Sequence, residues 1–184
     1  KYSIYYSGSS GYFEINTPTI STNMIHEGSG SGTGIYCSYI KETSQISNNT
    51  ISDISSAFAF SNCSPQVTGN IISLITYVPM KHINTANPVY SNNEYTQIIY
   101  EGVGIQGTIN SFDPTVPDMN LTLENIQGLG WPYVVTDDLT IGETGILSVP
   151  AGTVIKVEYN SSSTYSRDIF VEGILDLQGT SFSP

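Results

Sequence analysis

Positive charge is what this sequence has least of. Its 184 residues include 5 Lys and Arg against 16 Asp and Glu, so the net charge is −11, and charged residues make up only 11% of the chain. Ordinary globular domains carry roughly 25%. Five cations cannot neutralise a tract of phosphates, which excludes a nucleic-acid-binding protein. Ala (4) and Leu (8) are too scarce for a helical bundle, and there is no run of about 20 apolar residues to form a membrane span.

Cysteine is also scarce. Cys37 and Cys63 are the only two, and they give no disulfide framework. What the chain has instead is 25 Ser, 19 Thr and 14 Asn, together with 23 Ile and 11 Val. A hydrophobic share of 39% is enough to form a core, which argues against disorder. We therefore expect an all-β protein with a surface rich in hydroxyl and amide groups. This composition, with its low charge, favours an extracellular protein over a cytosolic one.

Four Asn residues mark an internal repeat in the first half of the chain. The intervals that separate Asn23, Asn49, Asn70 and Asn93 are 26, 21 and 23, and each Asn has Ile, Val or Tyr three residues before it and Ile or Tyr two residues after it. Short β-branched runs at this period predict a parallel β-helix, a solenoid with coils of about 21–28 residues. We expect each Asn to lie at a turn and to bond the Asn one coil away, which forms a ladder.

The two cysteines share an offset within this repeat. Cys37 stands at position +14 from Asn23, and Cys63 stands at the same offset from Asn49. In regular coils they would stack, with Cα atoms within the range that allows a disulfide, about 4.4–6.8 Å. Parallel side chains leave the Cβ atoms farther apart than a relaxed bridge prefers, so we expect two buried free thiols and keep the disulfide as the alternative. A zinc site would need about four ligands, and no His shares this offset.

A second repeat lies in the last third of the chain. Gly-Ile-Leu at residues 145–147 recurs at residues 173–175, a period of 28. Alternating apolar segments at 139–141, 154–157 and 169–171 predict strands with one buried face.

This part of the chain resembles a known family. Trp-Pro-Tyr-Val-Val-Thr-Asp-Asp-Leu-Thr-Ile at 131–141, with the segments at 145–156 and 171–180, is similar to secreted right-handed parallel β-helix proteins, the adhesin-like surface proteins of bacteria and archaea. Ser148 stands where the family pattern has Thr, and Val149 where it has Ile. The resemblance covers most of the chain and implies a right-handed solenoid, a secreted or cell-surface location and a structural or adhesive role. It implies no catalytic residues.

We divide the chain into three segments. Residues 1–107 form the irregular coils with the Asn ladder, residues 108–128 form a bridge, and residues 129–184 form a second β-helix stretch that the family would continue past Pro184. No amphipathic capping helix is visible at either end. Because uncapped ends expose strand edges, we expect either a longer chain or end-to-end self-association into filaments.

The sequence offers no catalytic or cofactor-binding constellation. His26 and His82 have different offsets from the ladder, so a shared metal is not expected. Arg167, the only arginine, lies beside Asp168, which we interpret as its surface partner. The alternative to having no cofactor is a Ca²⁺ ion at an acidic turn, either at Asp113 and Asp118 or at Asp137 and Asp138.

The leading hypothesis is a non-enzymatic extracellular β-helix with a structural or adhesive role. The alternative is a carbohydrate-active β-helix, either a polysaccharide lyase or hydrolase or a glycan-binding module. The alternative interpretation of the 13 Tyr residues, second to their preference for β-strands, is a face that binds a glycan or a host surface. The Tyr residues to test are Tyr2, Tyr5, Tyr6, Tyr159 and Tyr165. Tyr also simply suits β-strands.

Overall fold

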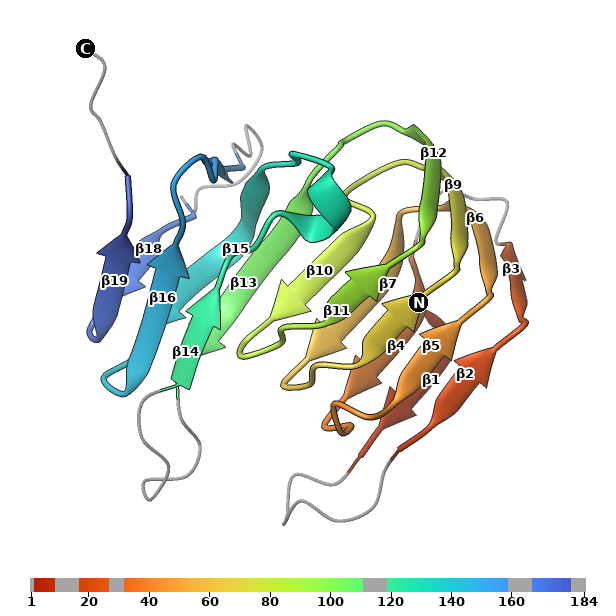
Figure 1. Cartoon of the computed structure of the whole chain (residues 1–184), viewed down its shortest axis with the longest axis horizontal. Coiled ribbons are helices and arrows are strands. Elements are labelled where there is room, and N and C mark those ends of the chain that lie inside the picture. The colour runs from red at the N-terminus through yellow and green to blue at the C-terminus, as the bar shows by residue number, and fades with distance from the viewer. Residues whose placement is uncertain (1, 9–16, 27–31, 111–118, 159–166, 180–184) are drawn as a thin grey trace.

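The computed structural model describes the chain except for residues 1, 9–16, 27–31, 111–118, 159–166 and 180–184 (Figure 1). Short strands and tight turns make up nearly all of the described chain, with one 3₁₀ turn, η1 (Ile126–Gly128). The strands are β1 (Tyr2–Ser7), β2 (Thr19–Ser21), β3 (Met24–His26), β4 (Thr33–Ser38), β5 (Gln45–Ser47), β6 (Thr50–Ile54), β7 (Ser56–Ser61), β8 (Gln66–Thr68), β9 (Ile71–Ile75), β10 (Met80–Ile83), β11 (Val89–Ser91), β12 (Glu94–Ile98), β13 (Val103–Ile109), β14 (Met119–Thr122), β15 (Tyr133–Ile141), β16 (Gly145–Val149), β17 (Ile155–Val157), β18 (Ile169–Val171) and β19 (Ile174–Leu177).

The first twelve strands visit three parallel sheets in rotation. Sheet A contains β1, β4, β7 and β10, sheet B contains β2, β5, β8 and β11, and sheet C contains β3, β6, β9 and β12. Every pairing is parallel and joins a strand to the third strand further along the chain, so the backbone coils with one strand of each sheet per turn (Figure 1). The prediction of an all-β chain with stacked parallel sheets is confirmed.

Aliphatic and aromatic side chains fill the interior of the coils. In sheet B, Ile20 stacks on Ile46 and Ile46 on Val67, and these are the residues three positions before the ladder Asn. All three are buried, as are Phe58 and Phe60 on β7. Burial of each such side chain contributes about 1.5–3 kcal/mol, and one coil alone has nothing to bury it against. The stability of the stack therefore arises between coils.

Residues with a left-handed backbone conformation, that is with positive φ, recur at fixed positions in successive coils. In sheet C, Asp53, Leu74 and Gln97 have φ of 54°, 53° and 53° and fall at the same point of three neighbouring strands. A second column precedes the ladder Asn in each coil, where Thr22, Asn48, Gly69 and Asn92 stand. Asn and Gly tolerate this conformation, whereas a β-branched Thr or a Leu is strained in it.

From β13 onward only sheet A continues, and the other two sheets are replaced. Sheet A continues through β13 and β15, and β15 then pairs along its first half with β17 and along its second half with β18. Sheets B and C end at β11 and β12, and a new sheet D follows with β14, β16 and β19. The predicted bridge, residues 108–128, contains the end of β13, β14 and η1.

Close packing explains the repeated Gly-Ile-Leu. A β-carbon added at Gly145 would lie 2.2 Å from the main-chain oxygen of Ile109, and one at Gly173 would lie 2.2 Å from that of Gly142. Gly145 begins β16 and Gly173 directly precedes β19, and each lies against the corner of the preceding coil, where only hydrogen fits. The period of 28 thus reflects one corner built twice.

Candidate functional site

The four ladder Asn residues lie in one column, joined by side-chain hydrogen bonds. Nδ2 of Asn23 donates to Oδ1 of Asn49 at 2.9 Å, that of Asn49 to Asn70 at 2.9 Å, and that of Asn70 to Asn93 at 2.8 Å. Each Oδ1 also accepts the backbone N–H of the preceding Asn. Asn49 and Asn70 are fully buried, so the column satisfies polar groups that burial would otherwise leave unpaired.

Gln127 ends the column, and the sequence analysis missed it. Its Oε1 accepts from Nδ2 of Asn93 at 2.6 Å and from the backbone N–H of Asn93 at 3.3 Å. Its Nε2 donates back to the Asn93 carbonyl at 3.1 Å. The longer Gln side chain thus reaches over the last Asn from η1. A search for Asn alone could not find it, and Glu124 stands three residues before Gln127, where the repeat has an apolar residue.

The structure corrects the expected register of the two cysteines. Cys37 lies opposite Phe60 on β7, not opposite Cys63. Paired residues on β4 and β7 in sheet A are 23 apart in the sequence, whereas paired residues on β2 and β5 in sheet B are 26 apart. The difference arises because the connection from β3 to β4 is longer than the connection from β6 to β7. Cys63 nevertheless donates from Sγ to the Cys37 carbonyl at 3.4 Å. Both thiols are free and buried, and burial raises the pKa of each to about 12.

The two histidines lie in different environments. His26, exposed on β3, has its Nε2 3.8 Å from the carboxylate of Asp53. His82 is buried on β10, where its Nε2 is 2.9 Å from the Tyr90 hydroxyl, and burial lowers its pKa to about 3.

The acidic residues singled out for Ca²⁺ do not converge in the part of the chain that the structure describes. Asp137 and Asp138 are both exposed in an irregular stretch of β15, where Oδ1 of Asp138 accepts the backbone N–H of Asp168 at 3.1 Å. Asp113 and Asp118 lie outside the described residues, as do Tyr159 and Tyr165. Within the described ranges, no three His, Cys, Asp or Glu side chains form a group that could hold a metal ion.

The outer face of sheet A carries a straight row of residues in register. Successive strand pairings place one residue from every strand side by side: Tyr5, Tyr36, Ala59, Lys81, Gly104, Val134 and Lys156. We call these seven residues the sheet A row. Six steps of about 4.8 Å make it about 29 Å long. The rings of Tyr5 and Tyr36 stack at 5.0 Å with an interplanar angle of 2°.

A charged network surrounds the middle of this row. Nζ of Lys81 lies 4.9 Å from the centre of the Tyr77 ring, and the Tyr77 hydroxyl donates to Glu158 at 2.6 Å. Arg167 pairs with the same carboxylate oxygen at 3.0 Å and donates from Nε to the Thr136 carbonyl at 2.5 Å. Burial raises the pKa of Tyr77, and its hydrogen bond to Glu158 adds to the rise. Arg167 therefore bonds Glu158, a partner that the sequence did not suggest.

Lys81 is a cation held in place without a matching carboxylate. Burial lowers its pKa, and the charge of Glu158 opposes that only in part. Its stem lies over Gly104, where an added β-carbon would come within 3.2 Å of Cγ of Lys81. Among the described residues, no acid forms an ion pair with Lys81 or Lys156; the ion pairs there are His26–Asp53 and Arg167–Glu158.

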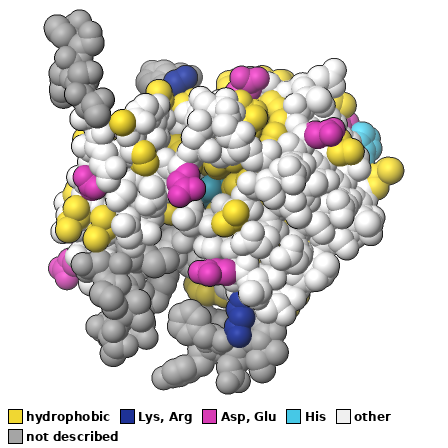
Figure 2. Space-filling model, viewed as in Figure 1, with side chains coloured by type: hydrophobic (Ala, Val, Ile, Leu, Met, Phe, Trp, Pro, Cys, Tyr) yellow, Lys and Arg dark blue, Asp and Glu magenta, His cyan; other side chains and the backbone are white. Residues whose placement is uncertain are grey.

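An aromatic cluster occupies the place where sheet B gives way to sheet D. His82 stacks on Tyr90 at 5.8 Å and meets Tyr133 edge-on, while Tyr95 meets Trp131 edge-on at 5.1 Å. Figure 2 shows a few histidine-coloured atoms near the middle of the face, beside acidic atoms. The Tyr95 hydroxyl is buried without a hydrogen-bond partner within the described structure.

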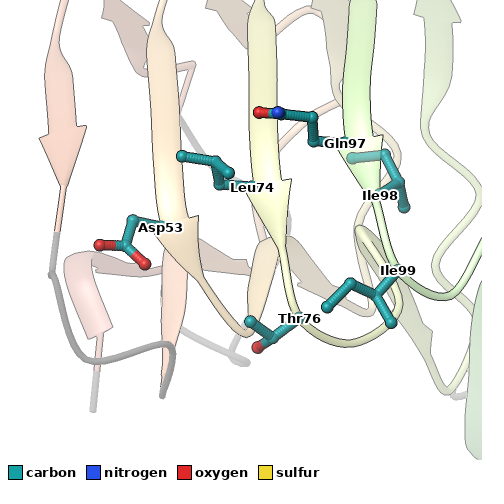
Figure 3. Close-up of a pocket in the computed structure, with 6 residues that line it drawn as sticks. All are labelled: Asp53, Leu74, Thr76, Gln97, Ile98 and Ile99. Atoms are coloured by element: carbon teal, nitrogen blue, oxygen red, sulfur yellow. The ribbon is translucent and has the colours of Figure 1, made fainter.

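A shallow groove crosses the outer face of sheet C (Figure 3). Asp53, Leu74 and Gln97 project along one side from the left-handed column, and Thr76 and Ile99 lie on the other. Leu74 is 46% exposed and Ile99 65% exposed, so the lining is largely apolar with one acid.

The comparisons with known proteins return no relative. No protein-family model matches the chain, and no curated protein or solved structure is significantly similar to it. None of the helical structure in the described residues is long and apolar enough to cross a membrane.

Proposed function

We propose that the chain is a non-enzymatic extracellular protein, a right-handed parallel β-helix that serves as a rigid structural or adhesive segment. The support for rigidity is the unbroken column from Asn23 to Gln127, which fixes one corner of five successive coils through side-chain hydrogen bonds that are buried in its middle. The right hand follows from the general rule for crossovers between parallel strands, about 98% of which are right-handed. Secretion rests on the composition and on the family resemblance.

The adhesive role predicts that the chain is displayed outside the cell. Antibodies raised against the purified protein should label intact cells of the source organism, and external protease should remove the label. Labelling that needs permeabilised cells would contradict the proposal. A crystal structure with a left-handed coil would refute the assigned hand separately.

The competing function, a carbohydrate-active enzyme, is favoured by one observation: Lys81, Tyr77, Glu158 and Arg167 meet, all half-buried, at the sheet A row. Base-catalysed cleavage of a uronate chain creates an unsaturated product that absorbs ultraviolet light, whereas hydrolysis creates new reducing ends. We expect neither signal on acidic or neutral glycans. Turnover that disappears in Lys81→Met or Glu158→Gln would overturn the non-enzymatic proposal.

We further propose head-to-tail association of copies. The strands furthest along the stack expose large apolar side chains: Phe170 and Val171 on β18, and Ile174 and Leu177 on β19. Light scattering across a concentration series should show growing assemblies, and Leu177→Lys should suppress them. Val89→Lys, at a similarly exposed apolar position on β11, is the control. A wild-type protein that stays monomeric throughout would refute the association.

A further inference from the structure

We infer that the sheet A row is a binding track for a linear acidic polysaccharide, held along the axis of the stack. The inference rests on the proposed adhesive role and gives it a ligand class. It begins with the distribution of charge. The chain has five cations, and three of them, Lys81, Lys156 and Arg167, lie on or beside this one row.

The cations on the row are arranged for an external anion. Glu158 already bonds Arg167 and Tyr77, so the nearest carboxylate is occupied and Lys81 keeps an unmatched charge. The Tyr77 ring and Gly104 fix the position of the Lys81 ammonium instead of leaving it to swing in solvent. An anion bound there would restore the stability of the charged form that burial takes away. Lys156, which is exposed, lies three strands further along the same row.

The shape of the row favours a narrow, extended ligand. Ala59 and Gly104 lie between the long side chains and keep the middle of the row low. Tyr5, 60% exposed, and Tyr36 provide stacked aromatic rings at one end, and sugars pack against aromatic carbon. Lys81 and Lys156 stand about 14 Å apart, three steps of about 4.8 Å. A uronate chain carries carboxylates at regular intervals and so can meet both ammonium groups at once.

A peptide partner fits this surface less well. The row crosses the middle of sheet A, where β4, β7, β10 and β13 each pair with a neighbouring strand on both edges. A peptide therefore cannot add to the row as a further strand. A stable protein interface also needs about 800 Å² on each partner with an apolar centre. A row with Ala and Gly between its two lysines and its tyrosines offers no such centre.

The test measures binding of the full chain to immobilised polygalacturonate and alginate, with dextran as the neutral comparison and polyglutamate as a charged polymer that is not a glycan. We expect binding to both uronate polymers, none to dextran and at least tenfold weaker binding to polyglutamate. Added salt should weaken the binding, because the contacts are ionic. Equal binding to polyglutamate would show that charge alone is recognised and would overturn the assignment.

The variants separate the row from the rest of the surface. Lys81→Met keeps the aliphatic stem and should weaken uronate binding about tenfold, the equivalent of one charged contact, and Lys81→Met with Lys156→Met should abolish it. Tyr5→Ala, at an exposed position, should weaken it about threefold. Lys41→Met removes a cation from the corner between β4 and β5 and should leave affinity unchanged. Wild-type protein that fails to bind, or a Lys41→Met loss as large as that of Lys81→Met, would refute the track. Surface labelling of intact cells would still stand in that case, so the two proposals fail independently.

Discussion

The column of amides makes a quantitative prediction at Asn70. Its side chain takes part in five hydrogen bonds: it donates to Ile46, Thr68 and Asn93, and it accepts the backbone and side-chain N–H groups of Asn49. Replacement by Ala removes all five. A net hydrogen bond contributes about 1 kcal/mol, and a buried donor left unpaired costs about 1–3 kcal/mol. The backbone N–H of Asn49, fully buried, loses this partner.

Some of the partners keep a second bond, which lowers the total. The Thr68 carbonyl still accepts from the Asn48 N–H, and Oδ1 of Asn93 still accepts from the backbone of residue 70. We therefore expect Asn70→Ala to reduce the free energy of unfolding by about 3–5 kcal/mol, a large share of the roughly 5–15 kcal/mol typical of a domain. Asn23→Ala removes two side-chain donations at the end of the column and should cost about 1 kcal/mol.

The measurement is urea unfolding followed by the fluorescence of Trp131, the only Trp. The slope of free energy against urea must be compared between variants, because solenoids can unfold in parts. Asn87→Ala is the control, since its exposed side chain makes no hydrogen bond within the described residues, and its effect should stay within about 0.5 kcal/mol. If Asn70→Ala costs no more than Asn23→Ala, the column does not hold the coils together.

Three further substitutions test the interior, the backbone and the corners. Burial lowers the pKa of His82 to about 3, whereas an unfolded His titrates near 6.5. The free energy of unfolding should therefore fall as the pH drops between these values, by up to about 1.4 kcal/mol per pH unit, and His82→Phe should remove this dependence. Urea unfolding curves at pH 7 and pH 5 that shift equally in the wild type and in His82→Phe would contradict the prediction. Leu74→Asn should raise the melting temperature, because Asn relieves about 1 kcal/mol of left-handed strain, whereas Ile71→Asn, equally exposed on the same strand, should not. Gly145→Ala should cost more than about 3 kcal/mol through its clash with a main-chain carbonyl, and Gly179→Ala, with open space around it, should be neutral in the same urea assay.

The sequence revealed the ladder because the ladder depends on residue type. Only Asn supplies a short amide that both donates and accepts within one coil spacing, so the four residues stand out with their apolar neighbours at −3 and +2. Gln127 does the same work with a longer side chain and a different backbone path, so the pattern passes over it. The Gly-Ile-Leu repeat with its period of 28 marked two strands of sheet D. Nothing in that repeat indicated that sheets B and C end before it, because their end follows from corner lengths.

The sheet A row escaped prediction for a related reason. The sequence separations between its successive members are 31, 23, 22, 23, 30 and 22. A backbone position is fixed by strand pairing, whereas the corners lengthen and shorten freely, so no constant period links Tyr5 to Lys156. The contact between Tyr77 and Glu158 spans a separation of 81. Neither residue type nor spacing marks that pair before the coils are stacked.

The set of sheets in the stack changes along its length, and this limits which sheets a head-to-tail contact between copies can extend. From Asn93 to β13 the chain has nine intervening residues, enough for the sheet C strand β12, whereas from Gln127 to β15 it has five, residues 128–132. The coil therefore has no strand of sheet C, and only sheets A and D continue beyond this point (Figure 1). A head-to-tail contact between copies can extend sheet A but leaves β3 of sheet C with no partner strand from the next copy. The sheet A row spans both kinds of coil within a single chain. Ligand binding along that row is therefore independent of assembly, and a monomeric Leu177→Lys variant should bind uronate polymers as the wild type does.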